Sequence, residues 1–167
     1  MEAPSITPAE YDRLHALHAL QILDTPPEER FDRLTRIVHE VFAMPMVQVT
    51  LVDADRHWAK SAVGLDRCEG PRNASFCDYA IASDDILVVT DARLDPRFAR
   101  HPAVNHPSGI CFYAGAPLHA GPERQRVGSL CLMDRAPRPL SPAQLTLLRD
   151  LADVGEQQLS GQQTVDA

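Results

Sequence analysis

The chain has 167 residues, of which 44% are hydrophobic and 23% charged, and its formal net charge is −7. This length allows one domain with a sizeable core and leaves little room for a second. The acidic balance argues against a nucleic-acid partner, because a phosphate backbone requires a basic surface. No apolar run is long enough for a membrane span and the N-terminus lacks the order of a signal peptide. We therefore expect a cytoplasmic protein without a membrane partner.

Two helices are expected at the start of the chain. Apolar side chains recur at helical intervals over residues 6–23, and residues 1–21 are expected to form an N-terminal helix that serves as a linker or dimer contact. In the next segment Thr25 and Glu28 have the spacing of a capping box, with two prolines in what would be the first turn. The helix that follows is expected to end before Pro45.

The hydrophobic period then changes to that of strands. Residues 46–53 and 57–64 predict two strands, the second with Trp58, Lys60 and Ala62 on one face. Further along, the pattern predicts a short helix capped by Ser75 and a strand at 86–92. A long connection follows at 93–109, with at most one short helix. Residues 110–120 and 126–134 predict a hairpin, and a capping box from Ser141 to Gln144 begins the last helix.

This order of elements predicts an α+β domain built on an antiparallel sheet. Residues 22–160 are expected to form the domain, and residues 161–167 a loose polar tail. No repeat of 20 to 50 residues is evident, which favours one domain over an array.

Six segments carry a resemblance to a known family. In chain order they are "ILDTPPEERFDRLT" (22–35), "VTLVDADRHWAKSAVGL" (49–65), "RNASFCDYAI" (72–81), "VVTDARLDPRFARHPAV" (88–104), "ICFYAGAPL" (110–118) and "VGSLCLMD" (127–134). Over roughly residues 20 to 155 the chain resembles the GAF domain family, the small ligand-binding and signalling modules of bacterial sensor kinases, diguanylate cyclases and phosphodiesterases. The resemblance implies a central antiparallel sheet with a cap of helices and loops enclosing a pocket on one face. On the other face it implies terminal helices that commonly pair with a second subunit.

Membership of this family leaves the ligand open. The Asn-Lys-Phe-Asp-Glu set of the cyclic-nucleotide-binding members is not found, and the sequence contains no Cys-His dipeptide of the kind that attaches a bilin. Because this fold serves many functions, a function can be inferred only from the residues of the site. We expect an unknown small molecule as ligand and assign no cofactor.

The four cysteines, at positions 68, 77, 111 and 131, lack C-x-x-C spacing, and no metal site is expected. Cys77 follows the predicted cap Ser75, where a helix dipole favours a thiolate, but its aromatic neighbours oppose one. Cys68 and Cys77 approximate the spacing of two functional cysteines in the free methionine-R-sulfoxide reductases, which share the GAF fold. The third cysteine of those enzymes has no equivalent here. A small buried residue is the favoured interpretation of Cys77, and also of Cys111 and Cys131.

The expected pocket lies between the sheet and the cap. Arg97 and Arg100 fall one helical turn apart near its mouth, where they could hold an anionic ligand; alternatively Arg93 or Arg97 pairs with Asp91 or Asp95. The other candidate pocket residues are mainly apolar: Phe76, Cys77, Tyr79, Phe98, Val104 and Tyr113.

The leading hypothesis is a non-catalytic GAF domain that senses a small molecule or transduces a signal. Ligand binding would order the 93–109 loop and the helix at 75–82, and the change would reach the terminal helices, which are expected to form a homodimer. Kinase or cyclase output domains are the expected protein partners. Two alternatives remain open: a methionine-R-sulfoxide reductase that uses Cys77 and Cys68, and a degenerate GAF module that only dimerises.

Overall fold

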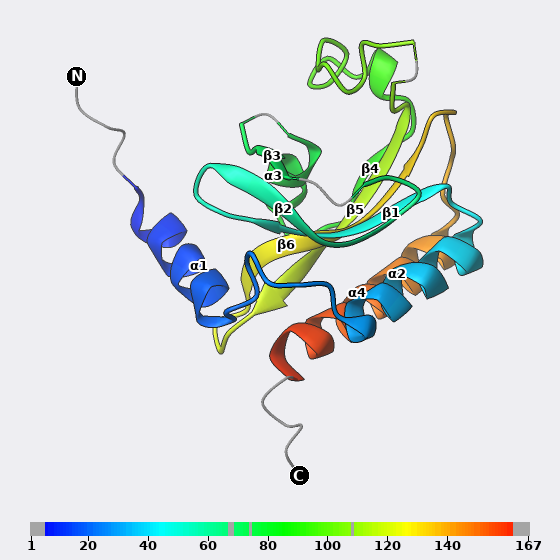
Figure 1. The fold of residues 1–167 in the computed structure, drawn as a ribbon. Helices are drawn as coiled ribbons and strands as arrows, with labels where there is room; N and C mark the ends of the chain where they lie inside the picture. The colour runs from blue at the N-terminus through cyan, green and yellow to red at the C-terminus, as the bar shows by residue number, and fades with distance from the viewer. Residues whose placement is uncertain (1–5, 67–68, 74, 108, 162–167) are drawn as a thin grey trace, which may run out of the picture.

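A six-stranded antiparallel sheet forms the centre of the computed structural model, which describes residues 6–66, 69–73, 75–107 and 109–161 (Figure 1). The strands lie in the order β3-β2-β1-β6-β5-β4, and every neighbouring pair is antiparallel. Their bounds are β1 Met46–Val52, β2 Arg56–Val63, β3 Glu69–Pro71, β4 Leu87–Val89, β5 Phe112–Ala120 and β6 Gln125–Asp134. The α+β class, the predicted hairpin of residues 110–120 and 126–134, and the two strands predicted at 46–53 and 57–64 are confirmed.

Helices cover one face of this sheet. Helix α2 (Glu29–Phe42) and helix α4 (Pro142–Ser160) lie side by side beneath it, while α1 (Pro8–Ala19) lies at one end (Figure 1). Alternate residues of β1 point into this layer, as the two-residue period of a strand requires. The apolar core there includes Val47, Val49 and Leu51 of β1, Leu34 and Val38 of α2, Leu148 and Ala152 of α4, and Leu14 and Leu17 of α1.

The opposite face carries the cap. It consists of the short helix α3 (Phe76–Ala80) and the connection between β4 and β5, which contains one 3₁₀ turn at Ala92–Leu94 (Figure 1). Helix α3 is capped by Ser75, whose hydroxyl accepts from the amide of Asp78 at 3.1 Å. Helices and cap both follow from the sheet, because its central strands are buried on both faces and each face must be covered.

Two predicted helix starts have different outcomes. The capping box at Ser141 and Gln144 is present in full. The one at Thr25 and Glu28 is wrong, because α2 begins later, at Glu29, and Glu28 makes no side-chain cap. The physical reason is a competing partner: the Lys60 ammonium lies 2.6 Å from the Thr25 hydroxyl and 2.7 Å from the Glu28 carboxylate.

Lys60 itself is fully buried on the helix side of the sheet. It also donates to the carbonyl of Pro26 at 2.6 Å, so its charge is met by a carboxylate, a hydroxyl and a carbonyl. The register between β1 and β2 shifts at Val49 and Thr50. The residue after Lys60, Ser61, therefore also faces the helices, and its hydroxyl donates to the carboxylate of Asp32 in α2 at 2.6 Å. The chain that enters α2 is therefore held by β2 rather than by a cap.

Two strands differ from their predicted extent. Strand β4 spans three residues instead of seven, and the three-residue strand β3 was not predicted because so short a segment has no readable alternation. No helix in the described part of the chain is long and apolar enough to cross a bilayer.

The variant Glu28→Gln is expected to lower the free energy of unfolding by about 1.5–3 kcal/mol, because it leaves a buried ammonium without its carboxylate. Glu29→Gln is the matched control, since Glu29 pairs with Arg36 at the exposed surface, where solvent screens the pair, and the variant is expected to lose much less stability than Glu28→Gln. Urea unfolding of both variants measures the difference. Equal losses would contradict the anchoring role of Lys60.

Candidate functional site

The residues predicted for the pocket gather beneath the cap. Phe76, Cys77, Phe98, Val104 and Tyr113 belong to one buried cluster, which also contains residues from β1, β4 and β6. They come from α3, from the 93–109 connection and from β5, so side chains from segments far apart in sequence meet over the cap face of the sheet. This cluster is separate from the core on the helix side.

Aromatic rings stack within this cluster. The ring centroid of Phe76 lies 4.4 Å from that of Phe98 and 4.6 Å from that of Tyr113, in stacked geometry. Tyr79 meets Phe98 edge-on at 5.0 Å and is about one-third exposed, at the rim of the cluster. Such pairs stabilise the cap beyond the area that they bury.

The two arginines expected at the mouth lie outside this core. Arg97 is exposed, and its guanidinium forms a two-point pair with Asp95 while covering the Phe98 ring at 5.1 Å. Arg100 is also exposed. Asp91 caps the 3₁₀ turn and pairs with Arg93, so the alternative of local aspartate pairs accounts for both Arg93 and Arg97.

Cys77 is buried under the cap. Its sulfur lies 3.9 Å from that of Cys131, and both this contact and its burial raise the pKa of the Cys77 thiol well above its usual range. A thiol with a raised pKa is a poor nucleophile at neutral pH. Cys68, the other cysteine of the reductase hypothesis, lies outside the described residues.

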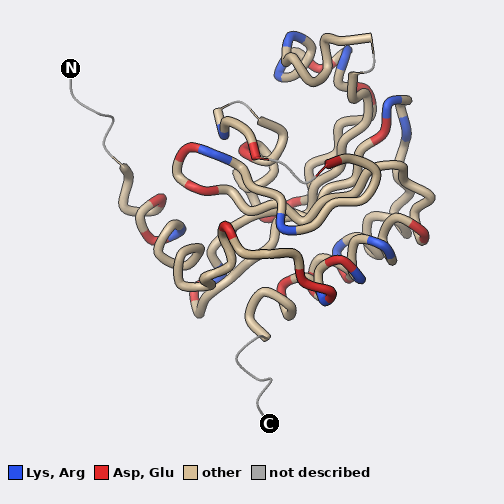
Figure 2. Tube along the Cα trace, viewed as in Figure 1, with Lys and Arg blue, Asp and Glu red and all other residues tan. Residues whose placement is uncertain are grey.

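A polar cleft, which sequence reasoning missed, opens beside the cap. Its volume is about 1200 Å³, and its walls come from α1, α3, the turn between β5 and β6, and α4. Acidic and basic side chains both line it, and Figure 2 shows Lys, Arg, Asp and Glu interspersed along the described chain, without a basic stripe. The charged residues in its walls include Glu10, Arg13, Arg72, Asp78, Asp84, Arg126 and Arg149.

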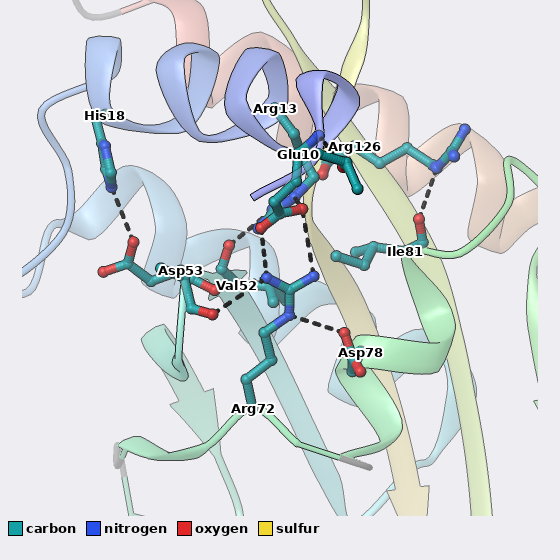
Figure 3. A network of polar contacts seen from close by, with 11 residues as sticks. Glu10, Arg13, His18, Val52, Asp53, Arg72, Asp78, Ile81 and Arg126 are labelled. Carbon is teal, nitrogen blue, oxygen red and sulfur yellow. Dashed lines mark hydrogen bonds and ion pairs between the residues drawn. The ribbon is translucent and has the colours of Figure 1, made fainter. Parts of the chain in front are cut away.

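Arg72 is the centre of the ion pairs on this side (Figure 3). Its guanidinium lies 2.6 Å from the carboxylate of Glu10 on α1 and 2.8 Å from that of Asp78 on α3. It also donates to the carbonyl of Asp53, just beyond the end of β1, at 3.2 Å. One side chain thus joins the N-terminal helix, the sheet and the cap helix.

Arg13 fixes α1 to the sheet directly. It is almost fully buried, donates to the carbonyl of Val52 at 2.7 Å, and forms a second ion pair with Glu10 at 2.9 Å (Figure 3). Partial burial raises the pKa of Glu10, but hydrogen bonds from Arg13 and Arg72 outweigh it and hold the pKa at about 2. The only sequence signal for this network was an arginine placed close before the cap of α3, and its partner Glu10 is 62 residues away.

A family model for the GAF domain matches residues 26–159. A cyclic di-GMP phosphodiesterase of Pseudomonas aeruginosa is 37% identical over 153 residues, which cover 91% of this chain and 26% of the phosphodiesterase. The chain spans about a quarter of the length of that relative.

Two solved structures illustrate the likeness in three dimensions. The GAF domain of an Acinetobacter phosphoenolpyruvate-protein phosphotransferase has a TM-score of 0.68 and 15% identity, with 97% of this chain and 99% of that one covered. A free methionine-R-sulfoxide reductase of Neisseria meningitidis, solved with its substrate, has a TM-score of 0.66 and 16% identity, with coverage of 98% and 97%. At these identities the likeness shows the fold alone.

Glu10→Gln is expected to flatten the pH dependence of stability between about pH 4.5 and pH 2. The folded-state pKa is depressed, so the carboxylate stabilises the fold fully above pH about 4.5, and this contribution is lost as pH falls toward 2. Urea unfolding at stepped pH should show a slope smaller by up to about 1.4 kcal/mol per pH unit. Glu123→Gln, in the same cleft, is the control, and an unchanged slope in the Glu10 variant would contradict the pairing.

Proposed function

Because the chain belongs to the GAF domain family, we propose that it is a non-catalytic signalling module in which the cap changes state and the helices carry the change onward. The observation that supports this most strongly is the double ion pair of Arg72. It links α3, which closes the cap, to α1, and both helices contribute side chains to the walls of the cleft. A cap movement that displaces Asp78 must therefore either break its ion pair with Arg72 or move Arg72, which changes the contact of Arg72 with Glu10.

We propose that a small molecule acts between the sheet and the cap, among Phe76, Cys77, Phe98, Val104 and Tyr113. The stacked rings are in contact with one another, so a ligand that enters there must displace at least one ring. Helix α3 has only five residues, which makes its displacement less costly than that of a long helix. A ligand would thus convert binding into movement of the cap.

Arg97 would take part at the rim, together with Tyr79 and Arg100. Its guanidinium covers aromatic rings of the cap while it holds Asp95, and an anionic ligand group could replace that carboxylate. The cost of parting an exposed pair is small.

The reductase alternative has less support from the geometry. Its nucleophile would be Cys77, whose burial and raised pKa oppose the thiolate that the reaction needs. The alternative of a module that only dimerises is favoured by the ring-to-ring packing of the cap interior.

The longer relative suggests the setting. Since the phosphodiesterase of Pseudomonas aeruginosa is about four times the length of the matched segment, we propose that this module works beside an output domain of the phosphodiesterase, cyclase or kinase kind. Dimerisation would occur through the helical layer, where α2 and α4 expose Ile37, Val41, Leu147 and Val154.

A metabolite screen read by thermal shift tests the ligand proposal. A true ligand should raise the melting temperature and slow amide exchange in α3 and in the 93–109 connection. A screen without any shift would support the dimer-only alternative. Turnover of methionine sulfoxide with a dithiol reductant, abolished by Cys77→Ser, would overturn the non-catalytic proposal.

Arg72→Gln is expected to speed amide exchange across α1 by roughly tenfold or more, because it removes two charge-assisted pairs. Arg93→Gln is the matched control, since Arg93 forms a comparable ion pair with Asp91, at the 3₁₀ turn of the connection between β4 and β5. Hydrogen exchange with mass spectrometry measures both variants. If α1 exchanges at the wild-type rate in Arg72→Gln, the proposed route from cap to helix is wrong.

The double variant Val41→Glu and Val154→Glu is expected to shift a dimer to monomer, because charges would enter an apolar contact between helices. Leu94→Glu, an exposed leucine on the cap side, is the control and should leave the dimer intact. Size-exclusion chromatography with light scattering gives the mass. A dimer that persists in the double variant but not in Leu94→Glu would place the interface on the cap.

A further inference from the structure

The cap face of the sheet contains a thiol with an unusual set of partners. Cys131 lies mid-strand in β6 and is fully buried. Its sulfur is 2.9 Å from the hydroxyl of Ser129, 3.1 Å from the hydroxyl of Tyr113 and 3.9 Å from the sulfur of Cys77. Two hydroxyls and a second sulfur thus converge on one thiol beneath the cap.

The sequence builds this arrangement through strand register. Ser129 and Cys131 are two residues apart and share the cap face of β6. Cys131 is paired across the sheet with Gly115, where a Cβ would lie 2.5 Å from the Tyr113 hydroxyl. The absence of a side chain at Gly115 lets the Tyr113 ring lie over it and bring its hydroxyl to the Cys131 sulfur.

These donors make the two thiols unequal. Burial raises the pKa of Cys131, but hydrogen bonds from Cys77, Ser129 and Tyr113 outweigh it and set the pKa below its usual value. The pKa of Cys77 is raised by the same contact and by burial. Of the two sulfurs, Cys131 is therefore the one that loses its proton more readily.

We propose that Cys131 and Cys77 are a redox pair that a hydroperoxide oxidises to a disulfide joining β6 to the cap helix α3. This goes beyond the proposed ligand response, because the pair needs no bound small molecule. The hydroperoxide is the oxidant, and a dithiol is the reductant that restores the thiols.

The chemistry proceeds in two balanced steps. The Cys131 thiolate attacks one peroxide oxygen, the O–O bond breaks, and the alkoxide or hydroxide that leaves takes up a proton, which gives a sulfenic acid. The Cys77 sulfur then attacks the Cys131 sulfur; an S–S bond forms, the S–O bond breaks, and the hydroxyl leaves as water with the Cys77 proton. Two electrons pass from the two thiols to the peroxide.

The position of α3 gives this pair both access and effect. This helix is one short turn, held by Ser75 and by the ion pair of Asp78 with Arg72, so local opening exposes the thiols at less cost than global unfolding. Once formed, the disulfide ties α3 to the centre of the sheet and restricts the opening of the cap. Oxidation would therefore hold the cap closed.

Tryptic peptides make the test specific, since each cysteine falls in a different peptide: Cys77 in residues 73–93 and Cys131 in residues 127–135. The full chain is treated with hydrogen peroxide, its remaining thiols are blocked with N-ethylmaleimide, and unreduced digests are analysed by mass spectrometry. We expect one linked peptide, 73–93 joined to 127–135, which dithiothreitol reverses. Oxidation that leaves Cys131 as a free thiol, or that links it to another cysteine, overturns the proposal.

Two variants separate the chemistry from simple packing. Tyr113→Phe keeps the ring and removes the hydroxyl, and it should slow formation of the linked peptide several-fold, because loss of this hydrogen bond raises the pKa of Cys131 and lowers its thiolate fraction. Cys111→Ser, a change in another buried cysteine, should leave the rate unchanged. Circular dichroism establishes that each variant is folded. Equal rates in wild type and Tyr113→Phe would contradict the role of the hydroxyl, and with it the proposed nucleophile.

Discussion

The central strands of the sheet are buried on both faces, and this constraint governs the rest of the molecule. Every residue of β1 and β5 is buried, as are most of β6. A polar atom on these strands has no contact with solvent and must form its hydrogen bonds within the protein. The helix side of the sheet is covered by an apolar core. On the cap side, the hydroxyls of Tyr113 and Ser129 form hydrogen bonds with the thiol of Cys131.

The same constraint explains why charged groups gather where the sheet ends. Arg13 can be nearly buried because its guanidinium meets the last carbonyl of β1 and the carboxylate of Glu10. On the cap side, Arg72 pairs with the same carboxylate of Glu10 and with Asp78 of α3. The packing of α1 against the sheet is thus electrostatic at its N-terminal half and apolar further along, at Leu14 and Leu17.

Local signals predicted the elements whose causes are local. Ser75 and Ser141 cap helices as expected, because a hydroxyl and an amide three residues away suffice for a cap. Thr25 had an equally good local pattern, yet its hydroxyl serves Lys60, 35 residues later in the chain. Sequence spacing holds no information about such a competitor.

The candidate site divides in the same way. Family resemblance placed Phe76, Phe98 and Tyr113 in one region, and they do stack together. The ion pairs of Arg72 and the hydroxyls around Cys131 were not foreseen, because they depend on register and on contacts between distant segments. Gly115 is an example: a side chain there would collide with Tyr113, but this requirement is visible only when the position of the Tyr113 ring is known.

The two edge strands, β3 and β4, have three residues each. They present little unpaired backbone, so the sheet offers a poor template for another strand and resists growth through its edges. The proposed association through α2 and α4 would instead rest on side-chain contacts between helices, where a change of angle is possible without breaking a ladder of hydrogen bonds. The proposed passage of small movements would benefit from this freedom.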